Sequence, residues 1–166
     1  MENTKLILSR RLMMRRFEKE DLEKNLEFIK DPKFFYMSKV ETEKELIESS
    51  LKNNYNFWHI VNKGMNDSIG TVKATEFENG VRIYIIINKS LRNRGYGREA
   101  LEAVIDYFFT LEQKEEVYLK SEKNNESFKT LIDKLHFKKY DEDTKYNFYK
   151  MDNLDYMKYF AIFGEI

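Results

Sequence analysis

The sequence predicts an α/β (α+β) fold, with a mixed and mostly antiparallel central sheet of six to seven strands flanked by about four helices. A β-branched run, Ile83–Ile87, is typical of a buried strand and is followed by a glycine-containing loop. Residues 100–109 then carry apolar side chains at helical spacing. Similar short apolar runs and amphipathic stretches alternate along the rest of the chain, and 166 residues suit one domain with a sizeable core.

Composition narrows the functional classes. The 29 acidic and 29 basic residues balance, so no overall field favours nucleic acid or an anionic membrane. No apolar run approaches the ~20 residues of a membrane span, and the first residues lack the apolar core of a signal peptide. There is no cysteine, and His59 and His136 show no ligand spacing. We therefore expect a cytoplasmic monomer or homodimer without a metal and without nucleic-acid or membrane partners.

The first part of the chain predicts one strand and two helices. Residues 11–17 alternate apolar and charged at several positions, which favours a strand. A helix is expected over about 19–30, where it ends before Pro32. Thr42-x-x-Glu45 is a capping-box pattern that opens a second helix.

The remaining elements follow in order. Strands are expected at 56–62 and 68–77, with Glu78-Asn79-Gly80 as a hairpin turn before the central strand. Residues 117–119 predict another strand, and Asn125 is expected to cap a further helix. Two last strands are expected at 137–140 and 146–151. The apolar extension 152–166 should pack on the body, with a partner subunit as the alternative.

The loop after the central strand has features of an anion site. Arg92-x-x-Gly95-x-Gly97 lies between a strand and a helix, where glycines allow close backbone approach and the first helical N–H groups point at an anion. The spacing differs from the dinucleotide and Walker motifs. Four cations, Lys89, Arg92, Arg94 and Arg98, would favour a pyrophosphate. The alternative is a solvated basic turn.

These residues resemble the acetyl-CoA loop of the GCN5-related N-acetyltransferases, the GNAT superfamily. The resemblance covers roughly residues 10–151 of a single acetyltransferase-like domain at 1–166. Arg11-Leu12-Met13-Met14-Arg15, followed by Asp21, is similar to the opening of the ribosomal-protein N-terminal acetyltransferase branch. Asn125 and Leu135-His136-Phe137 resemble that branch's later helix, with Phe128 at the place of a small residue and His136 at the place of a glycine expected at a left-handed helix end. Asn124 with Ser127 is the alternative, which needs a one-residue insertion; Asn125 is favoured.

The resemblance implies transfer of an acetyl group from acetyl-CoA, as cosubstrate, to a primary amine. The acceptor can be a protein N-terminus or a small-molecule amine. Backbone N–H groups of residues 94–98 would hold the pyrophosphate, and an N–H near Ile86 or Ile87 would stabilise the oxyanion. The cofactor-binding residues it implies are Ile86, Ile87, Arg92, Asn93, Arg94, Gly95, Tyr96, Gly97, Arg98 and Asn125.

The general base and the general acid of the implied reaction are less clearly indicated by the sequence. Arg82 occupies the place of the family's base, so Glu76 and Glu78 are the nearest candidates, with a solvated hairpin end as the alternative. Ile132 occupies the place of a tyrosine acid, for which Tyr84, Tyr118 or Tyr146 can substitute.

Two other functions remain open. One is a non-catalytic acyl-CoA-binding sensor or scaffold, favoured by Arg82, Ile132 and His136. The other is a basic-loop interaction domain that binds no CoA. His59 shares a strand face with apolar residues, so we expect a hydrogen-bonded structural residue rather than a base.

Overall fold

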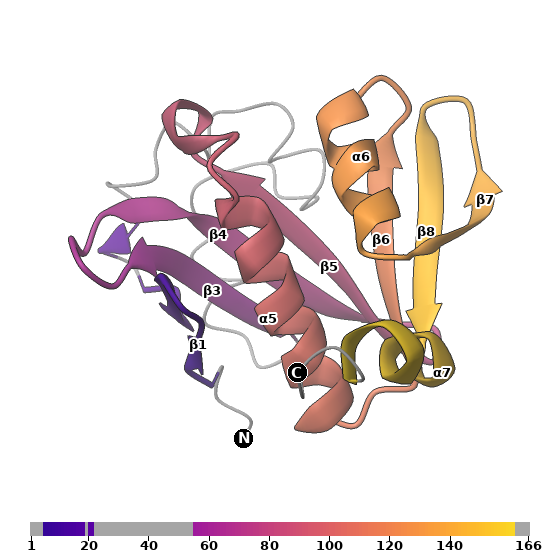
Figure 1. Ribbon diagram of the computed structural model, residues 1–166, viewed down its shortest axis with the longest axis horizontal. Coiled ribbons are helices and arrows are strands. Elements are labelled where there is room, and N and C mark those ends of the chain that lie inside the picture. The colour runs from indigo at the N-terminus through magenta and orange to yellow at the C-terminus, as the bar shows by residue number, and fades with distance from the viewer. Residues whose placement is uncertain (1–4, 19, 22–54, 162–166) are drawn as a thin grey trace. The chain divides into compact units, whose positions relative to one another are not determined.

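The computed structural model describes residues 5–18, 20–21 and 55–161 (Figure 1). Most of the helix predicted over about 19–30 and the helix predicted to open at Thr42 lie outside these residues. The described strands form one mixed sheet of eight strands in the order β1-β2-β3-β4-β5-β6-β8-β7. Their bounds are Ile7–Leu8, Leu12–Arg16, Tyr55–Asn62, Ser68–Phe77, Gly80–Ile87, Glu116–Glu122, Lys138–Glu142 and Tyr146–Asp152 for β1 to β8.

The predicted fold class is confirmed. β5 and β6 pair in parallel, whereas β1 with β2, β2 with β3, β3 with β4, β6 with β8 and β7 with β8 pair antiparallel. The described helices are α5 (Tyr96–Thr110), α6 (Glu126–Lys134) and α7 (Asn153–Tyr156), with short turns η1 (Lys89–Leu91) and η2 (Met157–Ala161). β1 was not predicted, because two residues are too few to show a period.

The chain divides into two compact units. Unit 1 comprises residues 1–75 and 84–103, and unit 2 comprises residues 76–83 and 104–166. β4, β5 and α5 contribute residues to both. In unit 1, several side chains of β2, β3 and β4 are fully buried: Leu12, Met14, Trp58, Ile60 and Val72. β2 alternates buried and half-buried residues, whereas five successive residues of β3 and six of β4 are buried, so both faces of these two strands are covered there.

A polar network is buried beside this core. Arg15 donates two hydrogen bonds to the Asp21 carboxylate, at 2.8 and 2.6 Å, and His59 Nδ1 lies 3.0 Å from Asp21 Oδ1. The other ring nitrogen of His59 lies 2.8 Å from Ser68 Oγ. The expectation that His59 is hydrogen-bonded is confirmed. Burial alone would raise the pKa of Asp21, but hydrogen bonds from Arg15 and His59 hold it well below its usual range.

Although serine, histidine and aspartate also form hydrolase triads, the charge arrangement here differs. In a triad, the carboxylate orients the histidine and stabilises its protonated form. Here the Arg15 guanidinium already binds both oxygens of Asp21, which neutralises that carboxylate. The network therefore joins β2, β3 and β4 to the segment that follows β2.

In unit 2, α6 covers one face of β6 and β8 (Figure 1). Val117, Leu119, Ile132 and Met151 are fully buried there. Gly80 pairs with Glu116 in the parallel β5–β6 register, and a Cβ on Gly80 would lie 1.7 Å from the Glu116 carbonyl oxygen. The glycine of the hairpin sequence Glu78-Asn79-Gly80 is thus required by close strand packing, whereas the positive φ of the turn, 47°, belongs to Glu78.

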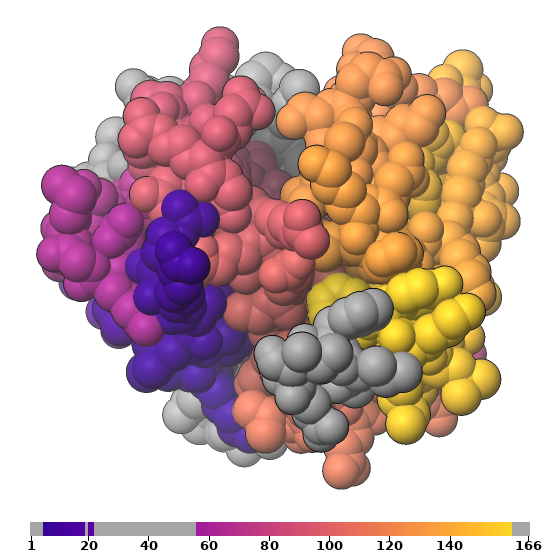
Figure 2. All heavy atoms as spheres, viewed as in Figure 1, coloured from indigo at the N-terminus to yellow at the C-terminus, as the bar shows by residue number. Residues whose placement is uncertain are grey.

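The described part of the C-terminal extension packs within unit 2. The ring of Tyr156 stacks on Phe109 at 4.7 Å, and its hydroxyl donates to Asp106. His136 has the left-handed φ of 64° where the resemblance implied glycine, and its ring stacks on Tyr159 at 4.0 Å. Figure 2 shows α6 in orange and α7 in yellow on neighbouring parts of the surface of unit 2. Among the described helices, none combines the length and apolar character that crossing a membrane requires.

The buried network makes unfolding sensitive to pH. Because folding lowers the pKa of Asp21, its contribution is present above the unfolded pKa of about 3.9 and is lost as pH falls through the folded value. We expect Asp21→Asn to lower the free energy of unfolding by about 3 kcal/mol at pH 7 and to flatten its fall below pH 4. Urea unfolding at several pH values measures both effects. Asp67→Asn, at an exposed position of unit 1, is the control, and equal losses in the two variants would contradict the prediction.

Candidate functional site

The glycine loop leads from the end of β5 into α5. The N–H of Asn88 donates to the Ile69 carbonyl at 2.8 Å, and the Asn88 side chain accepts from Ser90, which fixes η1 directly after the strand. Asn93 and Gly95 then adopt left-handed φ values of 64° and 80°. Asparagine and glycine are the residues that tolerate this region best. The chain therefore turns sharply twice before α5 begins.

The first turn of α5 presents unused backbone donors. The first helical hydrogen bond runs from the Glu99 N–H to the Gly95 carbonyl, at 3.1 Å. The N–H groups of Tyr96, Gly97 and Arg98 therefore precede the ladder and have no carbonyl within the helix to bind. The positive end of the helix macrodipole lies at the same place. This arrangement can bind the oxygen atoms of a phosphate group.

Glu99 fixes the position of this turn within unit 1. Its carboxylate accepts hydrogen bonds from Ser9 Oγ at 2.8 Å, from the Arg11 N–H at 2.6 Å and from Arg11 Nε at 2.7 Å. Arg11 also donates to the Arg94 carbonyl at 3.1 Å, and its guanidinium lies 4.4 Å from the centre of the Tyr96 ring. Burial alone would raise the pKa of Glu99, but the hydrogen bonds from Arg11 and Ser9 lower it.

The cations around the loop are exposed. Arg92 Nε donates to the Ile87 carbonyl at 2.9 Å, and Arg98 pairs with Glu102 one turn along α5. Neither Lys89 nor Arg94 makes an ion pair with another described residue. Their side chains can therefore turn toward an anion at the start of α5 without losing an ion pair.

The end of β5 lies very close to β4. A Cβ on Gly70 would lie 2.1 Å from the Ile86 carbonyl oxygen, so only glycine fits at that position. The sequence predicted that Gly70 lies in a strand. It did not indicate that Gly70 contacts Ile86, one of the two residues to which the resemblance assigns the oxyanion donor. The contact fixes the backbone at Ile86 and Ile87.

Asn125 belongs to unit 2, and its predicted capping role is confirmed. Its side-chain oxygen accepts from the Phe128 N–H at 3.1 Å at the start of α6. The amide nitrogen of Asn125 is left as a donor in a half-buried position. Ile132, at the place of the family's tyrosine acid, is fully buried in α6.

The other residues considered for acid–base chemistry also lie in unit 2, apart from Tyr84 in unit 1. Glu76 is exposed and pairs with Lys114 at 2.8 Å, while Glu78 is exposed at the tip of the β4–β5 hairpin. Tyr118 donates to Glu116, and burial with this hydrogen bond raises its pKa far above the usual value. A phenol that holds its proton so firmly is a poor acid. Tyr146 is buried, with Lys120 Nζ 4.0 Å from the centre of its ring.

Sequence reasoning missed the Ser9, Arg11 and Glu99 hydrogen bonds. Arg11 was noted only within the strand pattern that resembles the ribosomal-protein branch, and Glu99 was given no role. The available signal was a carboxylate in the first turn of the helix, a position that favours such a charge.

Comparison with known proteins identifies the family. Residues 11–138 match the model of the acetyltransferase (GNAT) domain, and the chain therefore belongs to this family. A comparison with curated proteins finds no significant match.

Solved structures share the fold at low sequence identity. An acetyltransferase of the GNAT family from Bacillus anthracis has a TM-score of 0.76 at 19% identity, covering 89% of this chain and 98% of its own. A spermidine N-acetyltransferase from Vibrio cholerae, in complex with CoA and spermine, has the same TM-score and coverages at 18% identity. A putative ribosomal-protein-serine acetyltransferase from Vibrio cholerae has a TM-score of 0.73 at 16% identity, covering 92% and 99%.

The close approach at Gly70 gives a direct test of the packing at Ile86. Gly70→Ala should lower the free energy of unfolding by about 3 kcal/mol or more, because the added carbon collides with backbone rather than with a movable side chain. Gly64→Ala meets only a side-chain atom at 3.5 Å and should change stability by less than about 0.5 kcal/mol. Denaturant unfolding compares the two, and similar values would show that β4 and β5 separate easily.

The contribution of Glu99 to stability can be compared with that of Glu102, a second glutamate on α5. Glu99→Gln should cost about 2 kcal/mol of unfolding free energy at pH 7, because its partners keep a weaker, neutral acceptor. Glu102→Gln, one turn along α5, removes only the exposed pair with Arg98 and should cost less than about 0.5 kcal/mol. Because the Glu99 pKa is lowered, the difference between the variants should shrink as pH falls below about 4. A difference that does not depend on pH would contradict this assignment.

Proposed function

We propose that the chain is an N-acetyltransferase that moves an acetyl group from acetyl-CoA to a primary amine, and that residues 1–166 form one acetyltransferase domain. The observation that carries the proposal is the start of α5. Three backbone N–H groups without helical acceptors follow two left-handed residues and lie among arginines, in a chain of the GNAT family. A diphosphate suits this combination of donors and charge.

Acetyl-CoA would supply the thioester carbonyl that the amine attacks, with no protein nucleophile. The N–H groups of Tyr96, Gly97 and Arg98, with Arg92, Asn93, Arg94 and Gly95, would hold its diphosphate. The Asn125 amide nitrogen would be a further cofactor contact. A backbone N–H at Ile86 or Ile87 would stabilise the oxyanion as the amine forms its bond to carbon.

The amine must lose a proton, and the thiolate released as the carbon–sulfur bond breaks must gain one. Glu78 and Glu76 remain the candidate bases, and Glu78 is the better one because Glu76 already pairs with Lys114. Positioning an amine that is already neutral, with water carrying the protons, would supply much of the rate without a protein base.

For the acceptor we propose a chemical class, a primary amine on a small molecule or at a protein N-terminus. Neighbouring structures include a spermidine N-acetyltransferase and a putative ribosomal-protein-serine acetyltransferase, which act on a small amine and on a protein respectively according to their names. A panel of acceptors should therefore contain both polyamines and peptides with free N-termini.

Calorimetric titration with acetyl-CoA tests the cofactor site. We expect micromolar binding that falls at least tenfold in Arg94→Ala, because a charge-assisted hydrogen bond to phosphate is lost. Gly95→Ala should also weaken it, since its left-handed φ of 80° disfavours alanine. Arg10→Ala, an exposed arginine outside the loop, is the control. Binding that is absent at millimolar acetyl-CoA, or unchanged in Arg94→Ala, would remove the proposal.

The second candidate is an acyl-CoA-binding sensor or scaffold without catalysis. Arg82 and the buried Ile132 favour it, because neither can act as the acid or base at its position. Release of free thiol from acetyl-CoA with any amine of the panel, above the uncatalysed rate, would decide for the enzyme. Binding without turnover would decide for the sensor.

A further inference from the structure

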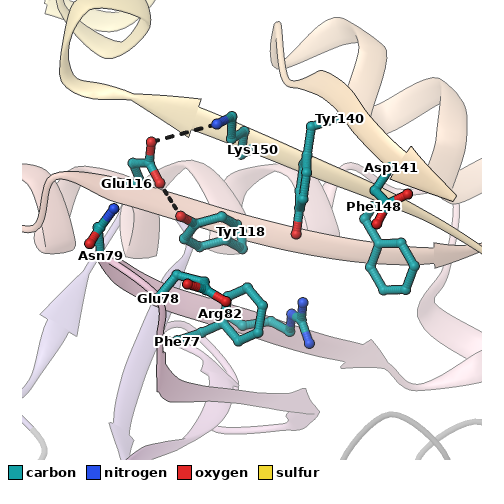
Figure 3. A pocket seen from close by; sticks show the side chains of 10 residues that line it. All are labelled: Phe77, Glu78, Asn79, Arg82, Glu116, Tyr118, Tyr140, Asp141, Phe148 and Lys150. Carbon is teal, nitrogen blue, oxygen red and sulfur yellow. Dashed lines mark hydrogen bonds and ion pairs between the residues drawn. The ribbon is translucent and has the colours of Figure 1, made fainter.

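A pocket of about 410 Å³ lies within unit 2, and none of the residues assigned to acetyl-CoA lines it. Figure 3 shows its lining side chains converging from the β4–β5 hairpin, β6, β7 and β8. Four aromatic rings form its walls, and charged groups of both signs lie between them. The lining residues are Phe77, Glu78, Asn79, Arg82, Glu116, Tyr118, Tyr140, Asp141, Phe148 and Lys150.

The rings form a continuous apolar surface. Phe77 packs edge-on against Tyr118 at 4.9 Å, Tyr118 against Tyr140 at 5.9 Å, and Tyr140 lies 6.5 Å from Phe148. These separations are typical of interacting aromatic side chains. A flat or apolar body of a small molecule can therefore lie against several rings at once.

Some of the charges in the pocket are already satisfied. Glu116 accepts the Tyr118 hydroxyl with one oxygen, and its other oxygen lies 3.7 Å from Lys150 Nζ. Lys150 Nζ also lies 5.5 Å from the centre of the Tyr140 ring. This acid and this base therefore offset each other, and neither is left to attract a ligand.

Arg82 is different. Its guanidinium stacks on Phe77, 3.6 Å from the ring centre, with Phe148 at 5.7 Å, and its Nε is buried without a hydrogen-bond partner. It makes no ion pair with another described residue. A guanidinium stacked by its face keeps the in-plane N–H groups that bind a carboxylate in bidentate fashion.

Two further carboxylates line the pocket. Glu78, at the hairpin tip, makes no hydrogen bond or ion pair with another described residue. Among the described residues, the Asp141 carboxylate accepts a hydrogen bond only from the neighbouring Glu142 N–H, at 2.8 Å. A ligand bearing only a carboxylate would satisfy Arg82 but would be repelled by these two acids, whereas an ammonium group would be attracted to them.

We propose that this pocket binds a small zwitterion of the amino-acid type, with its carboxylate on Arg82, its ammonium facing Glu78 or Asp141, and an aromatic or apolar body against the rings. The proposal is carried by the juxtaposition of four aromatic rings with one guanidinium and two carboxylates that make no ion pair with any described residue. The pocket contains Glu78, the better of the two candidate bases, but the proposal concerns binding alone and is tested without acetyl-CoA.

Calorimetry on the full chain without acetyl-CoA tests it with three probes. L-phenylalanine carries both charges, L-phenylalaninamide lacks the carboxylate, and N-acetyl-L-phenylalanine lacks the ammonium. We expect saturable binding of L-phenylalanine and at least tenfold weaker binding of each analogue. Absence of saturable binding of L-phenylalanine, or equal binding of N-acetyl-L-phenylalanine, would overturn the proposal.

Variants test which residues bind the carboxylate and the ammonium of the ligand. Arg82→Gln should weaken L-phenylalanine binding at least tenfold, whereas Arg10→Gln should leave it unchanged. The double change Glu78→Gln and Asp141→Asn alters exposed side chains, so the fold should be kept. It should abolish the preference for L-phenylalanine over N-acetyl-L-phenylalanine, and Glu115→Gln should not. A preference that survives the double change, or binding that survives Arg82→Gln, would contradict the assignment.

Discussion

The hydrogen bonds that Glu99 accepts from Ser9 and Arg11 hold the first turn of α5 in place. The direction of the free N–H groups of the first turn depends on that position. A carboxylate at a helix N-terminus would ordinarily compete with a bound anion for the macrodipole. Because the Arg11 guanidinium binds Glu99 and extends to the Arg94 carbonyl, the carboxylate is neutralised and the N–H groups of the turn stay available. The proposed anion site therefore depends on a contact between residues 88 positions apart in sequence.

Local signals were enough to predict the elements that form this site. The β-branched run of β5, the glycine after it and the helical period of α5 each fall within about ten residues, and Asn125 precedes the helix that it caps. The bridge between Arg11 and Glu99 could not be found in this way, because both residues look like ordinary polar positions of their own elements. The register that brings Gly70 against Ile86 is also absent from a single sequence, since it depends on how β4 and β5 pair.

The same limit applies to the charged residues of the core and the pocket. Asp21 matched a family pattern and His59 was expected to be hydrogen-bonded, but the sequence did not indicate that Arg15 binds the one and approaches the other. In unit 2, the rings of Tyr118, Tyr140 and Phe148 come from three strands, and a shift of one residue in any of them would point its ring to the opposite face. Only the paired sheet shows that these rings share a pocket with Arg82.

The two ends of the sheet bear on self-assembly. Open strand edges invite pairing with another chain, a common route to aggregation. β1, at one end, has only two residues and offers few backbone groups. β7, at the other, has a register irregularity between Lys139 and Asp141, and its Lys138 and Lys139 pair with Asp155 and Glu142. Adding a strand there would require charged side chains to be rearranged. A homodimer of this chain is therefore expected to form through a face of the molecule rather than by extension of the sheet.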